Sequence, residues 1–168
     1  MVKWTLIAGL VLVVLLLAVL VVGWLLPEKH HATRQAMLLA PPEAVWTLIS
    51  DVDAFPSWRN DVKSVERLPD RGGRAVWIEQ GSGGKVTYAV EEIQPPRRLV
   101  VRIADRDLPF GGAWTYEIAP AAGGASLTIT EDGEVYNPVF RFLSRFVFGH
   151  ESTMAAYLAA AEKRLARP

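Results

Sequence analysis

A single histidine on an otherwise apolar helical stripe is the clearest candidate in the sequence for acid–base chemistry. His150 lies between Val147 and Met154 in a run whose apolar residues recur at steps of three and four. Imidazole exchanges a proton near neutral pH, and Tyr157 follows on the same run. Arg102, in a candidate strand, is a second candidate, but alternation alone does not assign it to either face of a sheet. A lone histidine on such a stripe is more often a hydrogen-bonded core residue, so catalysis is the weaker interpretation.

Other common catalytic and metal-binding arrangements are absent from the sequence. The 168 residues include no cysteine, which excludes thiol nucleophiles and zinc–cysteine sites. His30 and His31 are adjacent and lack carboxylates at a spacing typical of a metal site. The glycine-rich segment 81–84 is not followed by a helical pattern, as a phosphate-binding loop requires. We therefore expect neither a metal ion nor a cofactor.

The elements that could position reactive side chains begin with an apolar segment at residues 4–26. These 23 residues carry no charge and would form a helix about 35 Å long, enough to cross a hydrocarbon core of about 30 Å. Trp4 and Trp24 lie near its ends, where aromatic rings contact the membrane interface. A cleaved signal peptide is the alternative. The run is longer than a typical signal core, however, and the residues before Pro27 offer no small pair for cleavage.

This pattern predicts a single-pass membrane protein, which we place in a bacterial inner membrane. Its expected parts are an anchor at residues 1–27, a polar linker at 28–33 and one domain at 34–168. The basic residues that flank the anchor are nearly balanced, so the side of the membrane that holds the domain stays open. Basic and acidic residues number 18 each, so no net charge favours a nucleic-acid partner.

The sequence of the domain predicts a strand and two short helices, then a run of strands and one long helix. Residues 34–39 form the first strand candidate, and Pro41 and Pro42 lead into a short helix. From residue 62 to residue 136, glycine and proline clusters separate six strand candidates, which predicts an antiparallel meander.

The end of the domain carries two further signals. Asp132–Gly133 would place a bulge in the last strand. Residues 138–166 carry an apolar stripe at helical spacing and predict one long helix that is buried against the concave side of the sheet. Gly149 is the position at which this helix could bend or break.

Three stretches of the domain carry a resemblance to a known family. Residues 40–46 (APPEAVW) enter the first helix, residues 51–58 (DVDAFPSW) follow it, and residues 154–158 (MAAYL) precede a basic tail. Together with the order of elements, they resemble the helix-grip fold of the START-like superfamily, in particular its polyketide cyclase/dehydrase or SRPBCC group. The likeness covers roughly residues 32–166.

The resemblance implies an α+β fold in which an antiparallel sheet of about seven strands wraps around a long C-terminal helix. It also implies a deep apolar cavity between the two, with walls of large side chains that could equally be core. The candidate ligand-binding residues are Trp58, Trp77, Tyr88, Trp114, Tyr116, His150, Met154 and Tyr157.

Because this fold serves carriers, receptors and enzymes, it leaves the function open. We expect a membrane-anchored protein that binds a hydrophobic small molecule such as a lipid, an isoprenoid or a polycyclic compound, and we favour binding over catalysis. The first alternative is a cyclase or dehydrase in which His150, Tyr157 or Arg102 positions an enolisable substrate, which needs at least two ionisable side chains in the cavity. The second is a membrane-tethered module that binds a protein partner.

Two aromatic residues of the last helix fall off its main stripe. Phe142 and Phe148 alternate with the basic residues Arg141 and Arg145. They could pack beneath the long loops, or they could contact lipid headgroups beside the anchor and gate the cavity.

Overall fold

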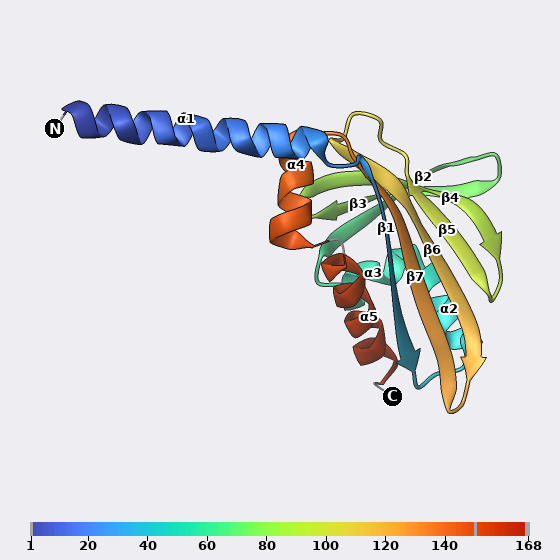
Figure 1. Ribbon diagram of the computed structural model, residues 1–168. Helices are drawn as coiled ribbons and strands as arrows, with labels where there is room; N and C mark the ends of the chain where they lie inside the picture. Colours follow the sequence, from blue (N-terminus) through green and yellow to red (C-terminus); the bar gives the residue numbers. More distant parts are fainter. Residues whose placement is uncertain (1, 150, 167–168) are drawn as a thin grey trace.

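The structure, a computed structural model, describes residues 2–149 and 151–166. Its centre is a seven-stranded antiparallel sheet in the order β1-β7-β6-β5-β4-β3-β2. The sheet curves around helices, and one long helix projects from it like a rod (Figure 1). The strands are β1 (Lys29–Leu38), β2 (Val62–Arg71), β3 (Arg74–Gly81), β4 (Gly84–Gln94), β5 (Arg98–Ile103), β6 (Phe110–Ala121) and β7 (Gly124–Val135). The helices are α1 (Val2–Leu25), α2 (Pro42–Ser50), α3 (Phe55–Trp58), α4 (Pro138–Leu143) and α5 (Ser152–Leu165), with a 3₁₀ turn at Val52–Ala54 and a π-helical turn at Ser144–Phe148.

This architecture is the predicted helix-grip fold. Strands β2 to β7 are a meander in which each strand pairs with the next, as the turn signals predict, and β1 closes the order by pairing with β7. Helix α2 begins at Pro42 and buries Val45 and Ile49, which lie one turn apart on one face. Helix α5 buries the second half of the predicted stripe against the sheet. The residues buried on α5 are Met154, Tyr157, Leu158 and Ala161.

The polar linker expected at residues 28–33 is wrong, because β1 begins at Lys29 rather than at Arg34. Lys29 pairs with Glu134, and the register continues without interruption along β7. The backbone N–H of Val135 donates to the carbonyl oxygen of Glu28 at 2.8 Å, which fastens the chain just before the strand. A long partner strand therefore orders residues whose polarity alone suggested a linker.

The bulge expected at Asp132–Gly133 is also wrong. Both neighbours of β7 keep regular register there, since Gly133 pairs with His30 on one side and with Gly112 on the other. The glycine serves a different purpose. A Cβ atom at Gly133 would lie 2.1 Å from the imidazole of His30, so the missing side chain makes room for that ring.

The single helix expected over residues 138–166 is interrupted. Helix α4 continues into the π-helical turn, and helical backbone geometry ends at Gly149, whose φ is +73°. A positive φ is accessible to glycine without steric penalty. The break leaves Phe140 about half exposed, so the first half of the stripe is not packed against the sheet as the second half is.

Helix α1 is long and apolar enough to cross a membrane, with a mean hydropathy of 3.3 over its most apolar window. A signal sequence near an N-terminus passes the same test. Nearly all of its described side chains are exposed, and its C-terminal end packs beside α4 (Figure 1).

Candidate functional site

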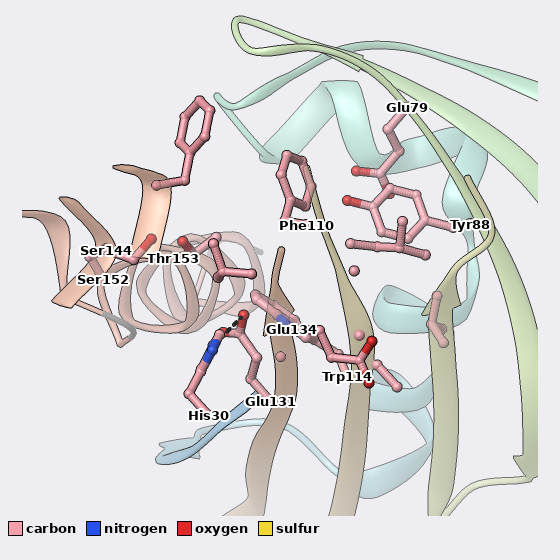
Figure 2. Close-up of a pocket in the computed structure, with 18 of the residues that line it drawn as sticks. His30, Glu79, Tyr88, Phe110, Trp114, Glu131, Glu134, Ser144, Ser152 and Thr153 are labelled. Carbon is pink, nitrogen blue, oxygen red and sulfur yellow. Dashed lines mark hydrogen bonds and ion pairs between the residues drawn. The ribbon is translucent and has the colours of Figure 1, made fainter. Parts of the chain in front are cut away.

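A cavity of about 350 Å³ lies between the inner face of the sheet and the segment that joins α4 to α5. Its walls come from β1 and from β3 to β7, and its outer rim comes from α4, the π-helical turn and the start of α5. Figure 2 shows Glu79 and Tyr88 on one side of the cavity and Ser144, Ser152 and Thr153 across from them. The apolar lining consists of Val101, Ile103, Phe110, Ala113, Trp114, Val135 and Phe140.

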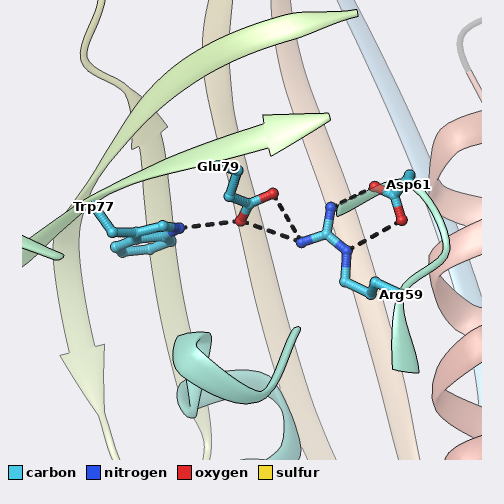
Figure 3. Close-up of polar contacts among 4 residues, drawn as sticks. All are labelled: Arg59, Asp61, Trp77 and Glu79. Atoms are coloured by element: carbon cyan, nitrogen blue, oxygen red, sulfur yellow. Dashed lines mark hydrogen bonds and ion pairs between the residues drawn. The ribbon is translucent and has the colours of Figure 1, made fainter. Parts of the chain in front are cut away.

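The buried end of the cavity holds an ionic cluster (Figure 3). Nη1 of Arg59 lies 3.1 Å from Oε2 of Glu79, and these side chains are only 11% and 9% exposed. Nη2 of Arg59 donates to Oδ2 of Asp61 at 2.6 Å, and Nε1 of Trp77 donates to Oε1 of Glu79 at 3.0 Å. Asp61 is 60% exposed, so it connects the cluster to solvent.

The environment of Arg59 keeps its guanidinium charged. Burial by itself lowers the pKa of Arg59, but its hydrogen bond to Asp61 and the charge of Glu79 outweigh that effect and raise the pKa overall. Arg59 also lies over the rings of Phe55 and Tyr157, 5.0 and 5.2 Å from their centroids, where the ring faces attract a cation. A permanent, desolvated hydrogen-bond donor therefore borders the cavity.

Two tyrosines of the cavity wall stay protonated. Burial raises the pKa of Tyr88, and the charge of Glu79 raises it further. Burial likewise raises the pKa of Tyr116, which is 8% exposed. Their phenol groups are therefore neutral donors and acceptors at ordinary pH. Together with Arg59, they can hold an uncharged oxygen atom of a ligand.

A second polar pair lies on β1 and β7. Nε2 of His30 is 3.4 Å from Oε1 of Glu131, and both side chains are partly buried (Figure 2). Burial lowers the pKa of His30, and the charge of Asp132 opposes that effect. The imidazole is therefore mostly neutral at neutral pH.

The structure brings three of the sequence-predicted ligand-binding residues to the cavity: Tyr88, Trp114 and Tyr116. Alternation places them on the inner face of β4 and β6, opposite Ile103, Val101 and Leu99 of β5, respectively.

The other predicted wall residues that the structure describes lie deeper, in the packed core. Trp58 and Tyr157 meet edge to face with centroids 5.2 Å apart, and Met154 is completely buried beside them on α5. Trp77 stacks behind Tyr88 at 5.8 Å. These residues support the wall without lining it.

The predicted reactive residues do not converge in the cavity. Arg102 lies on the outer face of β5, where its Nε is paired with Glu91, and neither residue faces the cavity. Tyr157 belongs to the core, as described above. His150 lies outside the described residues, so its place in the site stays a prediction.

The predicted membrane-contact residues fall into two groups. Trp4 and Trp24 are 77% and 71% exposed on α1. The ring of Phe142 packs on that of Phe146, with centroids 4.9 Å apart. The side chain of Phe148 lies outside the part of the chain that the structure describes.

Sequence reasoning missed Arg59, Glu79 and His30. Alternation along β3 puts Glu79 on the same face as Trp77, so assigning Trp77 to the interior would have brought Glu79 with it. Arg59 follows a short helix in a turn, where no periodicity applies. His30 was assigned to a linker that is in fact strand.

In the described part of the chain, no group of three or more histidine, aspartate and glutamate side chains is placed to hold a metal ion. The polar side chains of the cavity include Arg59 and the two tyrosines as hydrogen-bond donors, with Glu79 and Glu131 as acceptors.

Comparison with known proteins identifies a family that matches the whole segment from β1 to the end of α5. Residues 29–167 match the family described as polyketide cyclase/dehydrase and lipid transport. Comparison with curated proteins finds no match.

Solved structures with the same fold include aromatase/cyclases. The chain is similar to Zhui aromatase/cyclase from Streptomyces sp. R1128, with a TM-score of 0.68 and 18% identity over 83% of this chain and 94% of that one. It is similar to norcoclaurine synthase from Thalictrum flavum, with a TM-score of 0.65 and 12% identity over 83% and 88%. The di-domain ARO/CYC BexL of the BE-7585A biosynthetic pathway gives 0.69 and 16% over 84% of this chain, which spans about half (52%) of BexL. At these identities the likeness concerns the fold alone.

Proposed function

Because the chain belongs to the polyketide cyclase/dehydrase and lipid transport family, we propose that it is a membrane-anchored protein that binds a hydrophobic small molecule in the cavity described above. The observation that carries this proposal is the cavity itself. At about 350 Å³ it falls within the range of small-molecule sites. Its lining surface is mainly apolar, with polar groups at the buried end, on β1 and β7, and along the rim. A cavity filled by side chains would instead have favoured a protein-interaction module.

The polar end limits the chemistry of the ligand. Two carboxylates, Glu79 and Asp61, already neutralise the single guanidinium of Arg59. A further anion, such as a free carboxylate or a phosphate, would be repelled by these two carboxylates. A neutral oxygen, from a hydroxyl or a ketone, can accept from Arg59 or from a tyrosine phenol. The site therefore suits a mainly apolar molecule with a neutral oxygen function.

The anchor favours a ligand that comes from the bilayer. Helix α1 has the length and composition of a membrane span, and β1 begins only a few residues after it. A domain held so close to lipid can take up or present an apolar molecule locally, but it cannot carry one between distant membranes.

Native mass spectrometry of the full chain, extracted from its own membranes in mild detergent, tests the proposal. We expect a copurifying apolar ligand, and we expect Ile103→Trp to displace it by filling the cavity. Arg102→Trp is the matched control, because it adds the same side chain one residue away on the outer face. A consistently empty wild-type chain, or equal ligand loss in both variants, would contradict the proposal.

A cyclase or dehydrase activity is the second candidate function, and a specific observation supports it. Arg59, Glu79, Tyr88 and Tyr116 all border one cavity, which meets the requirement for converging ionisable groups. In such a reaction, Glu79 could take a proton from a carbon next to a ketone while Arg59 or a tyrosine donates to the ketone oxygen. The resulting enolate would attack a second carbonyl carbon, and a phenol would protonate the new alkoxide.

A linear poly-β-ketone thioester is a suitable probe for this activity. The full chain should convert it to a cyclic product, and Glu79→Gln should abolish turnover while Asp61→Asn retains most of it. Unchanged probe in the presence of the wild-type chain, with ligand copurification intact, would leave binding as the function and exclude this activity for polyketides.

A further inference from the structure

The end of the apolar helix packs directly against α4. Gly23 is buried, and a Cβ atom there would lie 2.0 Å from the carbonyl oxygen of Pro138. Only a glycine permits this approach of the two backbones. Val19 and Leu26, one turn away on either side, are the partly covered residues of the same face. The two helices are therefore in direct backbone contact, and α4 runs crosswise to α1 (Figure 1).

A buried arginine fastens this junction. Arg141 of α4 is 8% exposed, and its guanidinium donates to the carbonyl oxygens of Leu26 and Tyr136 and to the carboxylate of Glu28, each at 3.0 Å. These three partners lie at the end of α1, just before β1 and just after β7. The orientation of α4 relative to α1 is therefore set by side-chain contacts rather than by the chain connection alone.

The rest of the α4 segment presents apolar side chains outward. Phe146 and Val147 are 60% and 61% exposed, and basic Arg145 is exposed between them and α4. Trp24 and Leu25, at the end of α1, are exposed nearby. Aromatic, aliphatic and basic side chains together are the composition of a surface at a membrane interface. We call residues 139–147 the apolar rim.

The apolar rim also borders the cavity. Phe140 and Ser144 belong to the cavity lining, and Phe140 is 48% exposed. Phe140 therefore belongs both to the cavity wall and to the surface of the rim. Phe110, which also lines the cavity, is 38% exposed (Figure 2).

We propose that the apolar rim is embedded in the bilayer surface, so that the cavity opens toward lipid at Phe140 and exchanges its ligand with the membrane without passing through water. The proposal rests on the proposed anchoring of α1. It commits to lipid as the occupant because the rim is continuous with the membrane-spanning helix and is held to it by Arg141 and Gly23. An α1 that crosses the bilayer places a crosswise α4 along the membrane plane, at the depth of Trp24.

Site-specific fluorescence in the full chain tests this geometry. The chain lacks cysteine, so Phe146→Cys and Val147→Cys can each carry a single environment-sensitive nitrobenzoxadiazole label. Reconstitution is in vesicles of phosphatidylcholine and phosphatidylglycerol. We expect a blue-shifted emission that spin-labelled lipids quench. Leu39→Cys is the matched control, because Leu39 is an exposed leucine (82%) at the far end of β1, and its label should keep a water-like, unquenched emission.

Flotation of the same samples tests membrane anchoring by α1 separately from embedding of the apolar rim. A chain that floats with the vesicles but gives identical emission at positions 146, 147 and 39 would overturn the embedded rim and leave the anchor standing. A shift seen in native membranes but not in pure lipid vesicles would also overturn it, in favour of a protein partner. A chain that does not float would overturn both, whereas loss of copurifying ligand alone would leave the rim intact and contradict only the binding function.

Discussion

Within residues 2–149 and 151–166, Arg59 and Arg141 both have largely buried side chains, and their partners differ in kind. Arg59 faces two carboxylates and two aromatic rings at the closed end of the cavity. Arg141 faces two backbone carbonyl oxygens and one carboxylate, that of Glu28, at the junction of α1 with the domain. Both guanidinium groups are desolvated to a similar extent, with side chains 11% and 8% exposed.

The difference in partners indicates different roles: Arg59 belongs to a binding site, and Arg141 holds two parts of the structure together. Carboxylate partners cost free energy to bury and are seldom the most stable way to fill a core, so the Arg59 cluster is best explained by what it offers the cavity. Carbonyl partners from two separate segments join those segments to the helix that carries the arginine. We therefore expect substitutions at Arg59 and Glu79 to affect ligand and stability together, and substitutions at the Arg141 junction to affect the placement of α1.

The largest effect should follow Glu79→Leu. It leaves Arg59 with one exposed carboxylate partner and removes the acceptor of the Trp77 indole, so we expect a loss of about 3 kcal/mol in the free energy of unfolding. Urea unfolding of the full chain in detergent measures this. Asp61→Asn is the control and should cost less than about 1 kcal/mol, because Asp61 is largely exposed.

The double variant Arg59→Met, Glu79→Leu tests whether the loss of stability in Glu79→Leu comes from the unpaired charge of Arg59. It should recover most of the lost stability while ligand copurification stays absent. Equal destabilisation by the Glu79 and Asp61 variants would contradict the assignment of Glu79 as the buried partner.

The next effect should follow Arg141→Met, which removes three hydrogen bonds from a charged donor. We expect a loss of about 2 kcal/mol and faster hydrogen exchange at the Val135 amide, which bonds to Glu28. Arg145→Met is the matched control, since Arg145 is exposed and should tolerate the change. Ligand copurification should survive in both variants, in contrast to the Glu79 variant.

A smaller effect, of the order of 1 kcal/mol, should follow Gly23→Leu. Its Cβ atom would overlap the backbone of Pro138, so α1 and α4 must separate, and hydrogen exchange in α4 should increase. Gly9→Leu is a strict control on the same helix, because nothing lies within 4 Å of its Cβ position. If both variants behave alike, the α1–α4 contact does not hold in the protein.

The smallest effect should be a pH dependence from His30. Its folded pKa is lowered below the ordinary 6.5, mainly by burial. As pH falls through 6.5, the unfolded chain takes up a proton that the folded chain resists, so stability declines toward acid pH. His30→Gln should flatten this part of the profile, whereas His31→Gln, at a side chain 66% exposed, should leave it in place.

Comparison of the predicted and observed elements shows where local signals suffice. Glycine and proline clusters locate the meander, because a turn depends on the conformations of a few adjacent residues. The same clusters mislead at Gly133, whose role is to make room for His30 from another strand. The start of β1 and the break after α4 also depend on distant partners, which local patterns do not contain.

Signals within continuous segments were enough for three features. Composition and periodicity predict the apolar helix and the amphipathic face of α5, and the turn clusters predict the order of the meander strands. The sequence also indicated the family through residues 40–46, 51–58 and 154–158. The pairing of Glu79 with Arg59 inside the sheet, and the link that Arg141 makes between α4 and the end of α1, depend on contacts between distant segments. Alternation says which residues share a face, whereas the pairing of distant segments decides what that face meets.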